Sequence, residues 1–377
     1  LKDYEAAKTI LADKASKFTQ ANADNNLGVI YQQLAQVEIN AGNYDKALLY
    51  FNKALVYERK AGHDVNYRTI LKNIGEDVYF KKLNNVDQAF VYYRRAYNYA
   101  NKERSEDMFN AIESLSILNN IANIYVKKGV YDSAFKYFQL ALDQIKPGIS
   151  EEDLLYNSLE EFPMQERIGY IPTLLIDKGN AFRQRYETTR QLNDLREAVR
   201  VYKVADQFLD RMKSDQSDLK SKLFWRGHTR RLYENAIQAC YANDNVSDAF
   251  YFFEKSRAVL LIDKLNEQHW LNEEDIRKQT QLKKRILKLE NEYSTAAGSS
   301  SRHRELQKEL FEAKQEQDRL IQGIKERNPL YYQSFLDSNM ITLNDIRTDI
   351  LSDHDAFVEI FNGDSAVYVL VVTTNQT

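Results

Sequence analysis

Residues 118–141 read LNNIANIYVKKGVYDSAFKYFQLA, and residues 31–54 read YQQLAQVEINAGNYDKALLYFNKA. Both stretches place a glycine near the middle and then a tyrosine, an alanine, a phenylalanine and an alanine at matching intervals. Apolar residues at three- and four-residue steps form one buried stripe on a helix, so each stretch predicts two helices joined by a short turn. Ala35 and Ala122 stand where the two helices are expected to cross closely.

The same pattern recurs in three weaker copies with small and aromatic residues at corresponding places. They are Leu71, Ile74, Gly75, Ala89, Tyr93 and Ala96; Leu175, Gly179, Phe182, Ala198, Tyr202 and Ala205; and Tyr233, Ala236, Cys240, Ala249, Phe253 and Ser256. At the start, Tyr4, Ala7 and Leu11 fit the second helix of a further repeat. Because one helix pair cannot bury its own stripe, stacked pairs are expected to form an all-α, right-handed solenoid with a concave groove.

These motifs resemble the tetratricopeptide repeat (TPR) family over residues 1–265. The copies recur at roughly 40–65 residues instead of the family's ~34, and none carries the family's tryptophan. The resemblance implies a module that binds a partner peptide or protein in the groove. The repeated aromatic residues are interpreted as core packing.

Heptad-like spacing follows the repeats and predicts a long antiparallel helical hairpin over residues 266–328. The apolar positions are Leu282, Ile286, Leu289 and Tyr293, then Leu306, Leu310, Ala313, Leu320 and Ile324, with a flexible turn at 297–301 between the two runs. The same heptads could pair between chains, so a homo-oligomer through residues 279–324 is an alternative. The basic runs at 283–285 and 302–304 are interpreted as a solvated face.

The last part, residues 329–377, predicts a linker helix and a short β-hairpin. Thr342 and Asp345 form a capping box, and strand-like runs at 356–361 and 366–372 flank a turn at 362–365. The second run is apolar on both faces, which predicts burial of both faces. Because a two-stranded hairpin is marginal alone, we expect these strands to begin a larger β-containing domain, completed by further sequence or by another chain.

The order of these parts resembles the region of TPR proteins that leads into a CHAT domain, a caspase-like fold of the cysteine-peptidase group. Its more specific parts are Glu-Lys-Ser-Arg-Ala at 254–258 and Glu-Ile-Phe-Asn-Gly-Asp at 359–364. The resemblance implies a regulatory scaffold whose bound partner controls an adjoining CHAT domain. Alternatively, the chain is the inactive N-terminal portion of a cysteine peptidase whose His/Cys dyad lies beyond Thr377. No residue here matches that dyad, so the chain itself is expected not to be an enzyme.

Composition excludes several other classes. The 52 basic and 55 acidic residues give a net charge of −3, which argues against nucleic-acid binding by phosphate neutralisation. No apolar run reaches the ~20 residues of a membrane span. Cys240 is the single cysteine, which excludes disulfides and multi-thiolate zinc sites, and we interpret it as a small buried hydrophobe. No metal or cofactor is predicted, and the compartment stays open, with the cytoplasm slightly favoured over export.

The candidate binding residues are polar positions on the first helix of each pair, on the side away from the helix crossing. They are Gln32, Gln36, Lys72, Asn119, Asn123, Asn180 and Arg183. The competing interpretation of each is an ordinary solvated surface residue. The Lys/Asn set that clamps C-terminal carboxylates in some TPR proteins is not reproduced, because Gln32 and Gln36 occupy the first repeat. A chaperone-tail ligand is therefore disfavoured.

Overall fold

The computed structural model describes most of the chain, in two compact units that divide at residues 181 and 182. The described residues are 2–20, 24–102, 108–155, 169–215, 219–267, 274, 277, 278, 281, 282, 285, 286, 288, 289, 292, 301–327 and 341–377. Tyr293 and residues 297–300 of the turn predicted at 297–301 lie outside them, whereas Ser301 is the first residue of a helix. The predicted domain limits at 265 and 328 stay a prediction.

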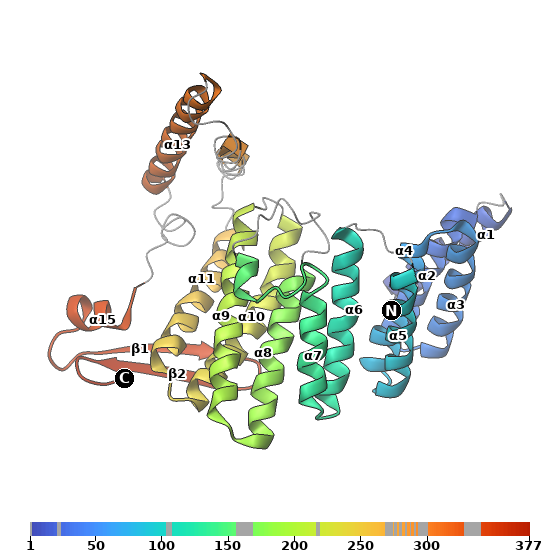
Figure 1. Ribbon diagram of the computed structural model, residues 1–377, viewed down its shortest axis with the longest axis horizontal. Helices are drawn as coiled ribbons and strands as arrows, with labels where there is room; N and C mark the ends of the chain where they lie inside the picture. The colour runs from blue at the N-terminus through green and yellow to red at the C-terminus, as the bar shows by residue number, and fades with distance from the viewer. Residues whose placement is uncertain are drawn as a thin grey trace. The chain divides into compact units, whose positions relative to one another are not determined.

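The first unit is helical, and Figure 1 shows its helices standing in consecutive pairs. Its elements are α1 (Lys2–Gln20), α2 (Asp24–Asn40), α3 (Tyr44–Ala61), α4 (Asp64–Asn73), the π-helix η1 (Ile74–Phe80), α5 (Val86–Lys102), α6 (Met108–Lys127), α7 (Tyr131–Leu142), the 3₁₀-helix η2 (Glu152–Leu155) and α8 (Tyr170–Thr189), which crosses the unit boundary. Helix α2 pairs with α3, α4 and η1 pair with α5, and α6 pairs with α7.

The two quoted stretches form these pairs for the expected reasons. Gly42 and Gly129 end the first helices with φ values of 81° and 71°, a left-handed conformation that glycine adopts without steric cost. The small crossing residues Ala35 and Ala122 are fully buried, and so is Phe138. The predicted repeat core is therefore confirmed.

The second unit continues the helix pairs and ends in the β-hairpin. Its elements are α9 (Leu192–Asp215), α10 (Leu219–Ala242), α11 (Val246–Glu267), α13 (Ser301–Arg327), α15 (Leu343–Asp345), the π-helix η4 (Ile346–Ile350), β1 (Ala356–Asn362) and β2 (Val367–Thr373). Buried Asp206 ties α9 to the last pair, accepting hydrogen bonds from the hydroxyls of Tyr233 at 2.7 Å and Tyr251 at 2.5 Å.

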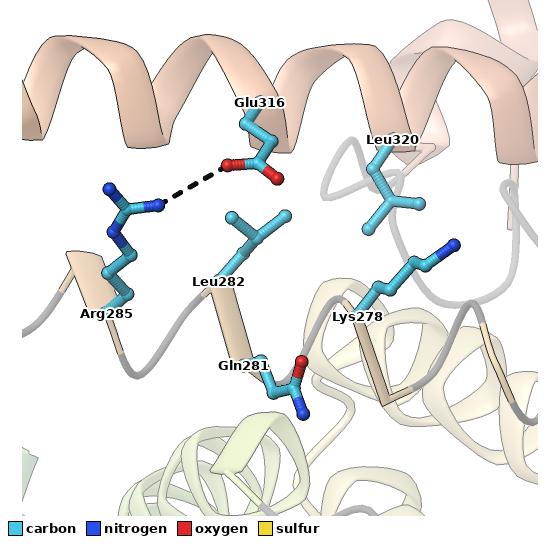
Figure 2. Close-up of a pocket in the computed structure, with 6 residues that line it drawn as sticks. All are labelled: Lys278, Gln281, Leu282, Arg285, Glu316 and Leu320. Atoms are coloured by element: carbon cyan, nitrogen blue, oxygen red, sulfur yellow. Dashed lines mark ion pairs between the residues drawn. The ribbon is translucent and has the colours of Figure 1, made fainter.

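The heptads at 282–324 bring two helical segments together. Ile286 and Leu289 pack against Leu306 and Ala313 of α13. Figure 2 shows the neighbouring cleft of about 510 Å³, where Leu282 and Leu320 come from opposite segments. At its rim Arg285 pairs with Glu316 at 3.5 Å. The heptads therefore pair within this chain.

The C-terminal segment follows the predicted order. Thr342 accepts from the backbone N–H of Asp345, whose side chain accepts from the Thr342 N–H in return, so the capping box is present. Strands β1 and β2 pair antiparallel, with Phe357 opposite Val372 and Phe361 opposite Tyr368. The predicted fold class, a helical repeat array followed by a helical hairpin and a short β-hairpin, is confirmed.

Candidate interaction surfaces

A polar network, buried at Lys72, Glu113 and Asn119, joins three helices of the first unit: α4, α6 and the part of α8 up to residue 181. We call it the first-helix seam: Lys72 of α4, Glu113, Asn119 and Asn123 of α6, and Tyr170 and Asp177 of α8. The Lys72 ammonium donates to the Tyr170 hydroxyl at 2.8 Å and lies 3.7 Å from the Glu113 carboxylate. Burial lowers the pKa of Lys72, but Glu113 and Tyr170 more than offset this, so the pKa is raised overall.

The other half of the seam is built from amide side chains. Asn119 and Asn123 both donate through Nδ2 to the same oxygen of Asp177, at 2.9 and 2.7 Å. The Oδ1 atom of Asn119 is buried and accepts no hydrogen bond within the described part of the chain. The seam therefore ties α6 to α8 and keeps one amide acceptor unused.

The structure brings only some of the predicted groove residues together. Asn119 and Asn123 meet at Asp177, whereas Lys72 has other partners, Glu113 and Tyr170, on the same two helices. Lys72 and Asn119 are buried instead of open to solvent. On α2, Gln32 is half-buried and Gln36 is exposed.

The remaining two candidates lie on α8. Asn180 is buried, and half-buried Arg183 pairs with Glu187 of the same helix at 2.6 Å. A partner-binding role for all seven candidates stays a prediction.

Sequence reasoning missed Glu113, Tyr170 and Asp177. A sequence signal exists for Glu113 alone: polar residues recur at three- and four-residue steps along helix α6, at 113, 116, 120 and 123, although 110, 114 and 119 are polar as well. A polar stripe on a helix that is buried elsewhere needs hydrogen-bond partners on the neighbouring helices.

The second surface is where the β-hairpin packs on the last helix pair. We call it the hairpin seam: Phe250, Phe253, Glu254 and Arg257 of α11 and Ile346 of η4, against Phe357, Glu359, Phe361, Leu370 and Val372 of the strands. Phe250, Ile346 and Val372 form its apolar centre. The Phe253 and Phe361 rings meet edge to face at 6.1 Å between centroids. Figure 1 shows the strands lying beside α11.

A carboxylate of α10 holds the tip of the hairpin. Glu234 accepts from the backbone N–H groups of Asp364 at 2.9 Å and Ser365 at 2.7 Å, and also from the Ser365 hydroxyl. A Cβ at Gly363 would come within 2.7 Å of the Glu234 carboxyl group and 2.9 Å of the Ala366 carbonyl oxygen, so a larger residue would have to shift the turn or the carboxylate. Burial raises the pKa of Glu234, but these donors and Arg230 outweigh it and the pKa is lowered. The turn is thus held by a charged acceptor.

The outer face of the hairpin is apolar and open. Its five β-branched residues are between 45% and 64% exposed: Val358, Ile360, Val367, Val369 and Val371. The expectation that both faces of the second strand are buried is therefore wrong for the described residues, in which α11 and η4 pack on the inner face and the outer face stays exposed.

Comparison with known families identifies the helix pairs. Tetratricopeptide repeat models match residues 29–59 and residues 114–143, which span the pairs α2–α3 and α6–α7. The chain contains tetratricopeptide repeats. These are the two stretches that carried the sequence resemblance, and TPRs indicate a protein–protein interaction module.

One solved structure shares the fold of these TPRs. The crystal structure of BtubC (BKLC) from P. vanneervenii superposes with a TM-score of 0.51 at 14% identity, over 70% of this chain and 92% of that one. No curated protein matches the chain in sequence.

TPRs are typically non-catalytic, and the chemistry of Cys240 agrees with that. Cys240 is fully buried, and burial raises the pKa of its thiol to about 12, so it carries almost no nucleophilic thiolate at neutral pH. No three His, Cys, Asp or Glu side chains of the described ranges are grouped to hold a metal ion. In the same ranges, no helix has both the length and the apolar character to cross a bilayer.

Proposed function

We propose that the chain is the repeat region of a CHAT-type regulatory protein. It binds a partner peptide or protein on the first helices of its TPRs and controls an adjoining caspase-like domain. One observation carries the proposal: the segment that resembles the first CHAT strands is clamped to the last helix pair by Glu234 and the hairpin seam. A change in that helix pair would therefore be passed directly to the strands.

The open outer face of the hairpin supports a continuing domain. Five β-branched residues exposed on one side of a two-stranded sheet form an apolar surface that water solvates poorly. The parallel sheets of α/β folds are covered by helices on both faces. In the proposed whole protein, further sequence covers this face and extends the sheet.

Chemical labelling tests the continuing domain. In residues 1–377, a Val369→Cys variant is expected to react rapidly with a maleimide, because native Cys240 is buried and position 369 is 55% exposed. In a protein extended by the downstream coding sequence, labelling should slow at least tenfold, while a Gln33→Cys control reacts equally in both. Equal labelling at position 369 would contradict a covered face.

The alternative is that this chain is the inactive N-terminal portion of a cysteine peptidase. The downstream coding sequence separates the two proposals: a His and a Cys at predicted strand ends favour the peptidase, and their absence favours a scaffold. Residues 1–377 should cleave no peptide substrate in either case. Cleavage that depends on Cys240 would refute both.

The partner surface is tested best on α2, where the candidates are not part of a buried network. A Gln32→Ala, Gln36→Ala double variant should lose at least tenfold of the partner that the immobilised wild-type chain captures from its source lysate. Gln33→Ala, exposed on the same helix, is the matched control. Asn119→Ala with Asn123→Ala extends the test to the seam, and undiminished capture would remove those two from the site.

The helical hairpin that includes α13 also offers a contact between two copies of the chain. Phe311 of α13 is 62% exposed although its neighbours Leu306 and Ala313 are buried. We propose that this side of α13 pairs with a second copy. Sedimentation of a variant lacking residues 279–324 should show loss of a dimer that the whole chain forms; an unchanged mass would contradict it.

A further inference from the structure

An acidic side chain lies in the middle of the apolar face of the β-hairpin. Glu359 shares the inner face of β1 with Phe357 and Phe361, and its cross-strand partner is Leu370. Its side chain is 10% exposed. A lone carboxylate in such a place costs several kcal/mol unless it is paired or neutralised.

The groups that face Glu359 from α11 do not supply a full partner. Arg257 holds its Nε 3.8 Å from Glu359 Oε1, but the same guanidinium also pairs with Glu254 and is half exposed to water. Glu359 Oε2 is buried, and no N–H or O–H of the described residues donates to it. The carboxyl group of Glu254 lies within hydrogen-bonding reach of the Glu359 carboxyl group. Two carboxylates thus face one shared, solvent-screened cation.

The remaining charged groups around the hairpin are engaged elsewhere. Arg230 of α10 pairs with Asp364 at 2.7 Å, and Glu234 binds the turn. Arg347 of η4 donates to the Thr373 carbonyl and the Thr377 hydroxyl. Strand β2 adds only Tyr368, whose ring meets Tyr241 of α10. Within the described residues, Glu254 and Arg257 are therefore the charged groups that face Glu359.

We propose that Glu359 and Glu254 share one proton, and that this proton is a latch that holds the β-hairpin on the last helix pair. With the proton present, a carboxyl O–H donates to the neighbouring carboxylate and satisfies the buried oxygen. Without it, two ionised carboxylates repel each other across the seam, and the β1 side of the seam opens while Glu234 still holds the turn. The latch belongs to this chain and does not depend on the proposed downstream domain.

The titration of Glu359 supports this geometry. Burial, and then the Glu254 charge, raise its pKa to about 7, against the opposing effect of Arg257. A free hairpin would return the carboxyl group to its ordinary pKa of about 4.3. A group whose pKa is raised by docking stabilises the docked form at low pH, and this contribution is lost as the pH rises through the docked pKa. The latch is therefore closed in mild acid and loosens above neutrality.

Amide hydrogen exchange of residues 356–373 in the whole chain tests the latch. After correction for intrinsic exchange rates, the opening equilibrium of the hairpin should rise about tenfold between pH 6 and pH 8. The amides of α2 and α3 are the internal reference and should not change. A Glu359→Gln variant, which is neutral and carries its own donor, should give a flat response, whereas the exposed control Glu312→Gln should keep the wild-type response.

A second variant keeps the test decisive if Glu359→Gln alters the docking itself. Glu254→Gln removes the neighbouring charge and supplies a donor, so the midpoint of the pH response should move to lower pH. A wild-type hairpin whose protection is constant from pH 6 to pH 8 would overturn the latch. So would an unmoved midpoint in Glu254→Gln.

Discussion

The first-helix seam and the hairpin seam both bury charge, but they balance it differently. In the first-helix seam, the Lys72 ammonium meets the Glu113 carboxylate and the Tyr170 hydroxyl, and the Asp177 carboxylate meets two amide donors. In the hairpin seam, Glu254 and Glu359 share one exposed guanidinium. The helices of the first unit are thus joined by contacts in which each carboxylate faces an ammonium or two amide donors, whereas the hairpin seam places two carboxylates against one guanidinium and, in our proposal, needs a proton. We infer that the first contact is permanent and the second conditional.

The variant with the largest expected effect disrupts the contacts of Lys72 in the first-helix seam. Lys72→Met keeps the length of the side chain but removes the buried ammonium that pairs with Glu113 and donates to Tyr170. Removing one partner of a buried pair costs about 3–5 kcal/mol, so the free energy of unfolding from urea titration should fall by about that much. Lys82→Met, at an exposed position, should change it by less than about 0.5 kcal/mol. A loss below about 1 kcal/mol for Lys72→Met would show that the seam is not a structural link.

The variant with the next largest expected effect weakens the packing of the β-hairpin on α11. Phe361→Ala removes the ring that meets Phe253, and truncating a buried phenylalanine costs about 3 kcal/mol or more. Hydrogen exchange of residues 356–373 should accelerate roughly a hundredfold, while urea unfolding of the helical repeats stays unchanged. Ile360→Ala, the neighbouring residue on the open face, is the matched control and should have a much smaller effect. Equal acceleration in both variants would contradict one-sided docking.

The smallest effect concerns the open face itself. Val369→Thr replaces an exposed β-branched side chain by another. It should change the free energy of hairpin opening by less than about 0.5 kcal/mol. Val372 is fully buried on the inner face, and Val372→Thr should cost about 1–3 kcal/mol because it places a hydroxyl in an apolar cluster. Hydrogen exchange of residues 356–373, measured in both variants, compares their free energies of hairpin opening. An equal loss in the two variants would mean that both faces of the hairpin are packed.

The repeats were predictable because their contacts are local. Ala35 and Ala122 recur at one fixed place in the helix pair, and the spacing around them specifies the crossing. The capping box at Thr342 and the strand alternation at 356–361 are local signals as well. Such features need only short sequence windows.

The inward face of the hairpin was not predictable in the same way. Alternation separates Phe357, Glu359 and Phe361 from Val358 and Ile360, but both sets are apolar enough to be buried. The choice between them depends on α11, which lies about a hundred residues earlier. Glu234 and the turn it holds are 130 residues apart, so no spacing could reveal their contact.

The central claim is that the last helix pair clamps the strands of the β-hairpin. Hydrogen exchange of the hairpin, measured in the wild-type chain and in Glu234→Ala, tests this claim most directly. The wild-type amides of residues 356–373 should be protected well beyond those of a free two-stranded hairpin. Because hydrogen bonds to a charged acceptor are worth about 1.5–3 kcal/mol, Glu234→Ala should raise their opening at least tenfold and leave α2 and α3 unchanged. Wild-type amides that exchange like an unstructured peptide, or a Glu234→Ala variant with undiminished protection, would contradict the clamp.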